Sequence, residues 1–325
     1  MGGERVRTNV AAWFKTHSSV ASDWPLSSLV NAKALTSVSV VLPALNEAAT
    51  VGAIVGSIRR NLMDVDRPLV DELVVLDSGS TDATAEVAAR AGAVVVHRDD
   101  VLPELPSVPG KGEALWRSLA VTTGDLVVFV DADLLAFKST FITGLLGPLL
   151  TEGSTDLVKA TYDRPLADGT RVHPGGGGRV TELVARPLLN LHWPQLAGFV
   201  QPLAGEYAAR RTLLERLPFP TGYGVEIGLL IDALDRVGLN ALAQVDLGER
   251  RHRHHDDQKL GRMAAEIWQT AFARLPDPRS GRDIEPTLTQ FVRDGDESIP
   301  ISHDVTALER PPMVNVADYL RSQRS

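Results

Sequence analysis

Four short apolar runs that alternate with helical patterns constrain the fold of this chain more than any other feature. The runs, each rich in Val or Leu, are residues 37–42, 72–76, 93–96 and 125–130. Between the first two, residues 47–62 carry apolar side chains at the spacing of a helix. Apolar strands separated by single helices are typical of a parallel sheet covered on both faces. The sequence therefore predicts an α/β protein with a Rossmann-like, mostly parallel sheet.

The rest of the chain is less regular, and we expect one α/β domain, residues 35–275, rather than two independent ones. Further strands are expected at 156–160 and 241–247, and helices at 180–191, 224–237 and 259–274. Residues 1–34 are expected to form an N-terminal arm with one short helix. Residues 276–325 are expected to form a C-terminal extension that ends in a surface tail.

Composition excludes several classes of protein. The 325 residues carry a formal net charge of -8, which argues against a nucleic-acid partner bound through its phosphates. No apolar run approaches the roughly 18 residues that a transmembrane helix needs, so we expect no membrane insertion. The chain contains no cysteine, which suits a reducing compartment, and we expect a cytoplasmic location.

Two carboxylates, Asp131 and Asp133, directly follow the strand predicted at 125–130. Ligands bind at the carboxyl ends of the strands in open α/β sheets, and carboxylate pairs hold hard divalent cations against diphosphates. An acidic turn that merely ends a strand would look the same. The pair therefore indicates a nucleotide-sugar site only together with the other loops.

The loops after the first two strands allow two interpretations each. Asn46 and Glu47, in the loop 43–47, can bind a base or ribose, or can simply start a helix. Asp77, in the loop 77–82, lies where nucleotide-binding folds place the acidic residue that binds ribose, but a capped turn has the same pattern.

Two glycine-containing loops are candidates for binding anions. Lys111, in the loop 109–114, precedes a predicted helix whose N–H groups can face a diphosphate, although the spacing is not that of a Walker A loop. Residues 175–178 are four glycines, followed by Arg179 and Thr181, which can bind phosphate or carboxylate. A flexible linker is the alternative for the second loop.

Residues 250–255 hold three Arg and three His, and Glu226 follows a glycine-rich turn. The basic run is either a solvated charge cluster or a loop that brings an imidazole to a metal and guanidinium groups to phosphates. Glu226 is either a site carboxylate or a partner of the helix dipole.

Taken together, these motifs resemble glycosyltransferase family 81, which holds the glucosyl- and mannosyl-3-phosphoglycerate synthases. The match runs over residues 36–275, and the motifs that carry it start at Pro43, Asp77, Gly110, Asp131, Gly177 and Gly222. The resemblance implies a GT-A fold with a nucleotide-sugar half, 35–135, and an acceptor half, 136–275. It also implies a homodimer, and retaining transfer of a hexose to the 2-hydroxyl of 3-phosphoglycerate with Mg2+ or Mn2+.

The resemblance also implies roles for individual residues. Asp133 and His252 would ligate the metal, and Asp131, Asp133 and Glu226 would act in catalysis. Donor-binding residues would be Pro43, Ala44, Leu45, Glu47, Ser78, Lys111, Asp131 and Ala132. Acceptor-binding residues would be Gly178, Arg179, Thr181 and His254. Two positions depart from the mycobacterial pattern: Ala132 replaces Ser, and His254 replaces Asn.

UDP-glucose is the donor we expect, and GDP-mannose is the alternative. A GT-A glycosyltransferase with another acceptor, such as a polyprenyl phosphate, would normally need a membrane-associating segment, which the sequence lacks. A catalytically silent nucleotide-sugar binding protein would not need Arg179 and the basic loop. Nucleotidyl transfer is disfavoured because no Gly-rich loop with its lysine follows the first strand.

Overall fold

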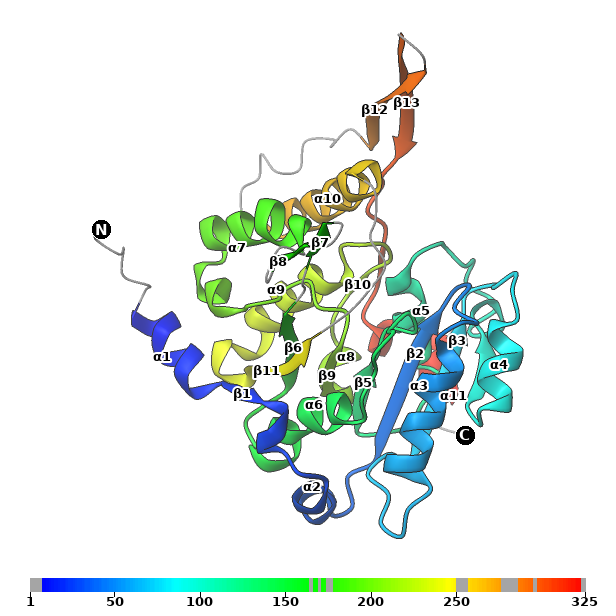
Figure 1. The fold of residues 1–325 in the computed structure, drawn as a ribbon, viewed down its shortest axis with the longest axis vertical. Coiled ribbons are helices and arrows are strands. Elements are labelled where there is room, and N and C mark those ends of the chain that lie inside the picture. Colours follow the sequence, from blue (N-terminus) through cyan, green and yellow to red (C-terminus); the bar gives the residue numbers. More distant parts are fainter. Residues whose placement is uncertain are drawn as a thin grey trace.

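An eight-stranded sheet forms the centre of the computed structural model, which describes residues 8–163, 166–168, 171–173, 178–249, 257–275, 286–294 and 297–322 (Figure 1). The strand order is β1-β11-β6-β9-β5-β2-β3-β4. These strands are β1 (Ser18–Val20), β2 (Val38–Ala44), β3 (Glu72–Asp77), β4 (Val94–His97), β5 (Leu126–Phe129), β6 (Leu157–Asp163), β9 (Tyr207–Arg210) and β11 (Leu242–Glu249). All neighbouring pairs in this sheet are parallel except those of β9, which runs antiparallel to β5 and β6. The predicted mostly parallel sheet is confirmed.

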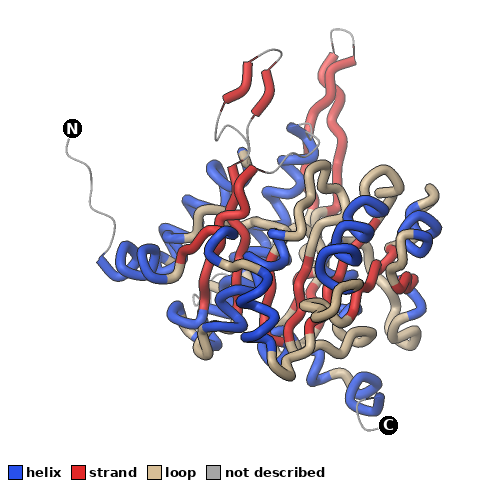
Figure 2. The backbone as a smooth tube through the Cα atoms, turned by 60° about the horizontal axis from the view of Figure 1, so that its bottom comes forward, coloured by secondary structure: helices blue, strands red, loops and turns tan. Residues whose placement is uncertain are grey.

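Helices lie on both sides of this sheet, as Figure 2 shows. They are α1 (Thr8–Thr16), α2 (Leu26–Lys33), α3 (Val51–Ile58), α4 (Thr84–Arg90), α5 (Lys111–Ser118), α6 (Thr140–Thr151), α7 (Arg186–His192), α8 (Arg211–Leu214), α9 (Val225–Val237), α10 (Asp257–Phe272) and α11 (Ala317–Ser322). Three two-stranded pairs lie outside the central sheet: β7 (Leu166–Asp168) with β8 (Arg171–His173), β10 (Phe219–Pro220) with β14 (Glu309–Arg310), and β12 (Thr287–Asp294) with β13 (Glu297–Asp304). In the described ranges, no helix is long and apolar enough to cross a bilayer.

Successive residues of β2 point to two separate hydrophobic cores, one on each face of the sheet. Val40 and Leu42 belong to the core that includes residues of α2, α3 and α6. Val41 belongs to the core that includes residues of α5, α7, α9 and α10. The alternation of side chains along a strand, with both faces buried, explains why the predicted strands are apolar at every position.

Helix α6 was not predicted, because Gly144, Gly147 and Pro148 interrupt its apolar pattern. The structure explains the two glycines by close packing rather than by a break in the helix. A β-carbon at Gly147 would collide with the ring of Trp24, and one at Gly144 would crowd Leu247. The helix thus lies closer to its neighbours than other residues would allow.

The N-terminal arm is more integrated than expected. Besides α1 and α2 it contributes β1, which extends the central sheet by pairing with β11 in parallel. Trp13 of α1 is 3% exposed, and its indole N–H lies 3.0 Å from the carbonyl oxygens of Leu239 and Leu242. The arm therefore belongs to the domain rather than lying beside it.

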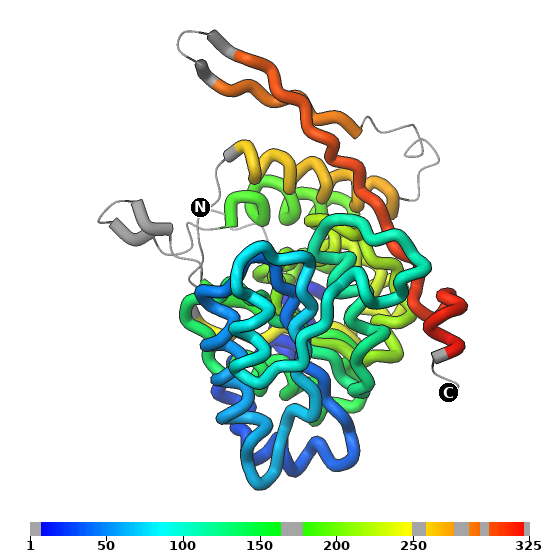
Figure 3. The backbone as a smooth tube through the Cα atoms, turned by 90° about the vertical axis from the view of Figure 1, so that its right-hand side faces the viewer, coloured from blue at the N-terminus to red at the C-terminus, as the bar shows by residue number. Residues whose placement is uncertain are grey.

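The C-terminal tail runs along the surface and is anchored there by a few buried side chains. Strands β12 and β13 form a hairpin that stands away from the body, and Figure 3 follows the chain (red) from this hairpin back down the side of the molecule. We call residues 305–322 the strap. Its side chains Val305, Met313, Val316 and Tyr319 are buried, the last three of them in the core that contains α5 and α9. The sequence did not indicate these anchoring residues, because isolated apolar residues in a polar segment give no periodic signal.

Candidate active site

Lys111 lies between two carboxylates where the α5, β5 and α9 segments meet. Its Nζ atom lies 2.5 Å from Oδ1 of Asp131, which follows β5, and 2.9 Å from Oε1 of Glu226, in the first turn of α9. The three side chains are 26%, 18% and 10% exposed, respectively. The site therefore combines charges from both halves of the chain in a mostly enclosed place.

The two carboxylates keep the lysine charged. Burial by itself lowers the pKa of Lys111, but the charges of Asp131 and Glu226 and their hydrogen bonds outweigh that effect. The net result is a pKa well above the ordinary value of a lysine. Lys111 can thus supply a permanent positive charge toward a phosphate.

Gly205 closes this group from the side of β9. A β-carbon at this position would overlap the carboxylate of Asp131 and the ammonium of Lys111, so the backbone approaches both groups directly. The turn is continuous with β9, whose Tyr207 pairs with Phe129 of β5 and Lys159 of β6. Only glycine leaves room for the ion pair here.

Lys159 and Glu206 form a second buried charged group next to the first. Lys159 is 2% exposed, donates a hydrogen bond to the carbonyl of Ala204 at 2.6 Å and lies 4.7 Å over the ring of Tyr207. Glu206 is fully buried. Burial lowers the pKa of Lys159 to about 8, with charge contributions from Glu226, Lys111 and Glu206 among the smaller causes.

The loops after β2 and β3 are tied to one another by their own polar groups. Asn46, in a left-handed conformation with φ 60°, accepts a hydrogen bond from the N–H of Thr81 at 2.8 Å. Asp77 is 5% exposed and accepts hydrogen bonds from the N–H of Ser80 at 3.2 and 3.3 Å. For Asn46 and Asp77, the interpretation as residues that hold the turns is the one the contacts favour.

The loop after β2 is also fastened to the acidic loop after β5. Thr50 donates a hydrogen bond to the carbonyl of Ala132 at 2.6 Å, and the N–H of Glu47 donates to Thr84 at 2.7 Å. Because β3, β2 and β5 are adjacent and parallel, their carboxyl ends meet at one edge. The structure thereby brings together the predicted donor-side residues, which are Pro43, Ala44, Leu45, Glu47, Ser78, Lys111, Asp131 and Ala132.

The predicted acceptor-side residues are only partly described. Gly178, with φ +84°, precedes the helical turn Thr181–Ala185, and its carbonyl accepts a hydrogen bond from Glu182 at 3.0 Å. Arg179 is exposed and Thr181 is buried. The glycines at 175–177 and the loop with His252 and His254 lie outside the described residues.

The oxygen ligands at the acidic loop fit a hard divalent cation. Mg2+ is commonly held by one or two carboxylates together with substrate phosphates, and Asp133 supplies such a carboxylate beside Asp131. Within the described ranges, no three His, Cys, Asp or Glu side chains gather as a complete metal cage. His252, the further predicted ligand, lies outside those ranges.

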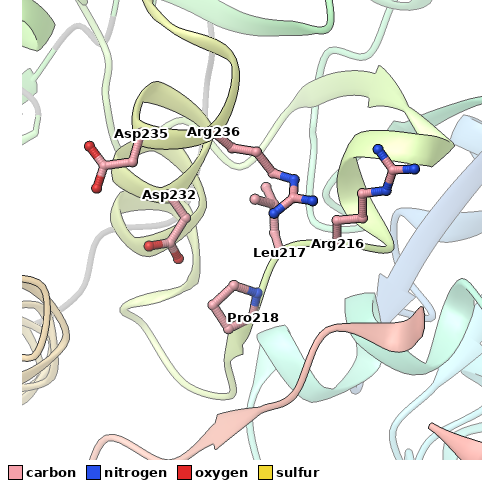
Figure 4. A pocket seen from close by; sticks show the side chains of 6 residues that line it. All are labelled: Arg216, Leu217, Pro218, Asp232, Asp235 and Arg236. Atoms are coloured by element: carbon pink, nitrogen blue, oxygen red, sulfur yellow. The ribbon is translucent and has the colours of Figure 1, made fainter. Parts of the chain in front are cut away.

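Two open pockets lie away from these residues. One, with a volume of about 260 Å³, is lined by Arg216, Leu217, Pro218, Asp232, Asp235 and Arg236 (Figure 4). The other, of about 280 Å³, is lined mainly by residues of the N-terminal arm and of α6. Neither contains a predicted site residue, so the candidate site rests on its charged groups rather than on cavity size.

Comparison with known proteins agrees with this geometry. The model of the Glycosyl transferase family 2 matches residues 39–202, a stretch that contains the loops after β2, β3 and β5 together with Lys111. The chain is therefore a glycosyltransferase, with the sheet and loops of that class.

Relatives place it more narrowly. The glucosyl-3-phosphoglycerate synthase of Mycolicibacterium smegmatis is 50% identical over 304 residues, which are 94% of this chain and 98% of that protein. A crystal structure of the Mycobacterium tuberculosis synthase with Mn2+, UDP-glucose and phosphoglyceric acid is 50% identical, with a TM-score of 0.78 over 90% of this chain and 95% of that one. Another, with Mg2+ and UDP, has a TM-score of 0.81 at 49% identity, covering 92% and 98%. The chain belongs to the glucosyl-3-phosphoglycerate synthases, and its GT-A fold is confirmed.

Sequence reasoning missed Lys159, Glu206 and Gly205 as parts of this site. A single glycine followed by a glutamate is too common a pair to indicate a site, and Lys159 lies within the strand expected at residues 156–160. A signal was present, because a lysine within an otherwise apolar predicted strand has to be paired or desolvated.

The lowered pKa of Lys159 leads to a prediction for the stability of the protein. Below pH 8 both folded and unfolded chains hold this proton; between pH 8 and 10.5 the folded chain has lost it while the unfolded chain retains it. The free energy of unfolding of the wild type should therefore rise relative to Lys159→Met over this interval, by about 3 kcal/mol in total. Urea titrations at several pH values measure the difference.

The exposed residue Lys15 supplies the control. Lys15→Met should follow the wild type through the same interval, because the side chain of Lys15 is exposed to solvent in the folded chain as it is in the unfolded one. If the wild type and Lys159→Met instead keep a constant difference from pH 7 to 10.5, Lys159 has an ordinary pKa in the folded protein.

Proposed function

We propose that this chain transfers glucose from UDP-glucose to the 2-hydroxyl of 3-phosphoglycerate with retention of configuration, giving glucosyl-3-phosphoglycerate. The observation that carries the proposal is the near full-length relation to the synthase whose crystals hold Mn2+, UDP-glucose and phosphoglyceric acid. GDP-mannose as donor, or another acceptor, is less favoured because the named relatives at 50% identity are glucosyl-3-phosphoglycerate synthases.

On the donor side, Lys111 stabilises the UDP leaving group. Negative charge grows on the diphosphate as the glycosidic bond breaks, so a fixed cation lowers the energy of the transition state more than that of the substrate. Asp131 and Glu226, held 2.5 and 2.9 Å from Lys111, are placed to accept hydrogen bonds from sugar hydroxyls. Pro43, Ala44, Leu45, Glu47, Ser78 and Ala132 would line the nucleotide.

When bound, Mg2+ or Mn2+ would neutralise part of the diphosphate charge and orient it. In this proposal Asp133 and His252 hold the ion. Asp133 lies only two residues from Asp131, so one short loop would hold both the metal ligand and the group that faces the sugar. Asp131, already paired with Lys111, stays directed toward the donor.

On the acceptor side, Arg179 and Thr181 bind the phosphate and carboxylate of 3-phosphoglycerate, with the N–H of Gly178 and the side chain of His254. A planar guanidinium suits both anions because it donates two parallel hydrogen bonds. The task of these residues is positioning, since the acceptor hydroxyl must be held close to the anomeric carbon on the side of the leaving group. Residues 35–135 thus bind the donor, and residues 136–275 chiefly bind the acceptor.

The proposal includes a homodimer in the cytoplasm. The hairpin of β12 and β13 exposes Phe291, Ile299 and Ile301, the first of them at 64%, and exposed apolar groups of this kind often mark protein contacts. Light scattering that gives the mass of a single chain would contradict the dimer. A cysteine-free sequence and charged metabolite substrates support the cytoplasmic location.

The direct test incubates the protein and Mg2+ with 3-phosphoglycerate and, in turn, UDP-glucose, GDP-glucose and GDP-mannose. We expect release of nucleoside diphosphate to be fastest with UDP-glucose and to depend on the acceptor. Fastest turnover with GDP-mannose would replace the proposal by its alternative.

Asp133→Ala is the matched inactive variant in the same assay. It removes a carboxylate that holds the metal, so most activity should be lost while circular dichroism shows an unchanged fold. Near wild-type turnover of Asp133→Ala in saturating Mg2+ would rule out the metal role.

Arg179→Ala should chiefly raise the KM for 3-phosphoglycerate. Loss of charge-assisted hydrogen bonds worth about 1.5–3 kcal/mol corresponds to a roughly 10- to 150-fold increase. Initial rates at varied 3-phosphoglycerate measure it, with Arg216→Ala, an exposed arginine outside the predicted site, as control. An unchanged acceptor KM for Arg179→Ala would remove Arg179 from the acceptor site.

A further inference from the structure

The strap holds the helix that carries Lys111. Arg310 of β14 makes two parallel bonds to Glu113, from Nε to Oε2 at 2.6 Å and from Nη2 to Oε1 at 2.7 Å, and its guanidinium lies 5.3 Å over the ring of Trp116. Glu113 and Trp116 belong to α5, and both are fully buried. A bidentate pair with a buried carboxylate is both strong and geometrically specific.

Glu113 also has a partner within α5. Arg117 donates to its Oε1 at 2.6 Å and is itself fully buried. Loss of Arg310 would therefore leave the carboxylate of Glu113 still paired with Arg117. A buried carboxylate without any partner, which strongly destabilises a protein, would not result. The contact from Arg310 therefore fixes the position of α5 relative to the strap. It does not supply the only positive charge beside Glu113.

Strand β10 lies between the strap and the segment around Lys111 and contacts both. Phe219 and Pro220 of β10 pair with Arg310 and Glu309 of β14, and the N–H of Thr221 donates to the carbonyl of Leu308 at 2.9 Å. On the side of α5, β-carbons at Gly110 and Gly112 would collide with the backbone of residues 220–221. Lys111 lies between these two glycines, so its backbone rests directly on the strand that the strap pairs with.

The partner of Lys111 follows the same strand. Glu226 comes shortly after β10, in the first turn of α9, so the 2.9 Å contact between Lys111 and Glu226 depends on how α5 sits against β10. Glu309, the strap residue before Arg310, connects to α9 instead of α5. Glu309 pairs with Arg274, which also holds Asp232 of α9 at 2.6 Å. The strap thus joins the helix that carries Lys111 to the helix that carries Glu226.

We propose that Arg310 is a positioning residue for glucosyl transfer: through Glu113 and the β10–β14 pair it keeps Lys111 between Asp131 and Glu226. This inference rests on the proposed function for its kinetic consequence. Arg310 touches no reacting group, so its loss acts only through the placement of Lys111.

Steady-state kinetics of Arg310→Ala and Arg310→Lys test the proposal. A small displacement of a catalytic group has a large effect on rate, so we expect kcat to fall about tenfold for Arg310→Ala, with the KM for 3-phosphoglycerate nearly unchanged. Arg310→Lys keeps the charge but loses the bidentate geometry, so its kcat should lie between those of the wild type and Arg310→Ala. It also serves if the alanine variant does not fold.

Tyr319→Phe is the matched control. It removes the side-chain hydrogen bond from Tyr319 to Glu215, on the part of the strap beyond Met313, and leaves the pairing of β10 with β14. If the strap acts only through general stability, Tyr319→Phe and Arg310→Ala will lower kcat in proportion to their loss of thermal stability, and the proposal is overturned.

A double-mutant cycle with Lys111→Ala separates positioning from an independent effect. If Arg310 acts through Lys111, then Arg310→Ala has no further effect on kcat once Lys111 is removed. If instead the double variant loses kcat by the product of the two single effects, the proposal is overturned.

Failure of the proposed function would be recognised separately, because the wild type would then not transfer glucose to 3-phosphoglycerate. Calorimetric titration with UDP and Mg2+ still tests the position of Lys111 in that case. We expect Arg310→Ala to bind UDP several-fold more weakly than wild type, and equal affinity overturns the proposal.

Discussion

The ion pairs of Lys111 with Asp131 and Glu226 are the interaction on which the rest of the site depends. Two carboxylates this close would repel each other in a mostly enclosed place, where charges interact more strongly than in water. The lysine turns that repulsion into attraction and so joins the end of β5, the start of α5 and the first turn of α9. These ion pairs therefore fix the relative positions of three segments that are far apart in the sequence.

Several residues around these ion pairs hold the surrounding loops in place. Three loops are held together by hydrogen bonds of the side chains of Asn46, Thr50 and Asp77. Gly205 and the two glycines beside Lys111 let backbone approach where side chains would not fit. Asp133 belongs to the short loop that follows β5 at the same edge of the sheet as Asp131. The parallel strands thus supply a rigid frame, and the loops supply the chemistry.

Much of this arrangement was predictable from local patterns. The four apolar runs became β2, β3, β4 and β5. Strands β2, β3 and β5 are apolar because both of their faces are buried, whereas β4 is the edge strand and leaves Val94 62% exposed. Other parts had no local signal. Tyr207–Arg210 form a strand because of their neighbours in the sheet, although Ala and Arg favour helices. The strap residue Arg310 meets Glu113 across almost two hundred positions, a contact that no spacing rule anticipates.

The reversed direction of β9 determines which changes of length the site can accept. Because it runs against its neighbours, its amino end, and with it Gly205, arrives at the edge where the other strands finish. Side chains alternate along a strand, so inserting or deleting a single residue within β9 would exchange the faces of Tyr207 and its neighbours and move Gly205 away from Asp131. Exposed connections such as residues 64–68 carry no such constraint. Divergence within this family should therefore appear as altered loop lengths around an ungapped segment 204–210.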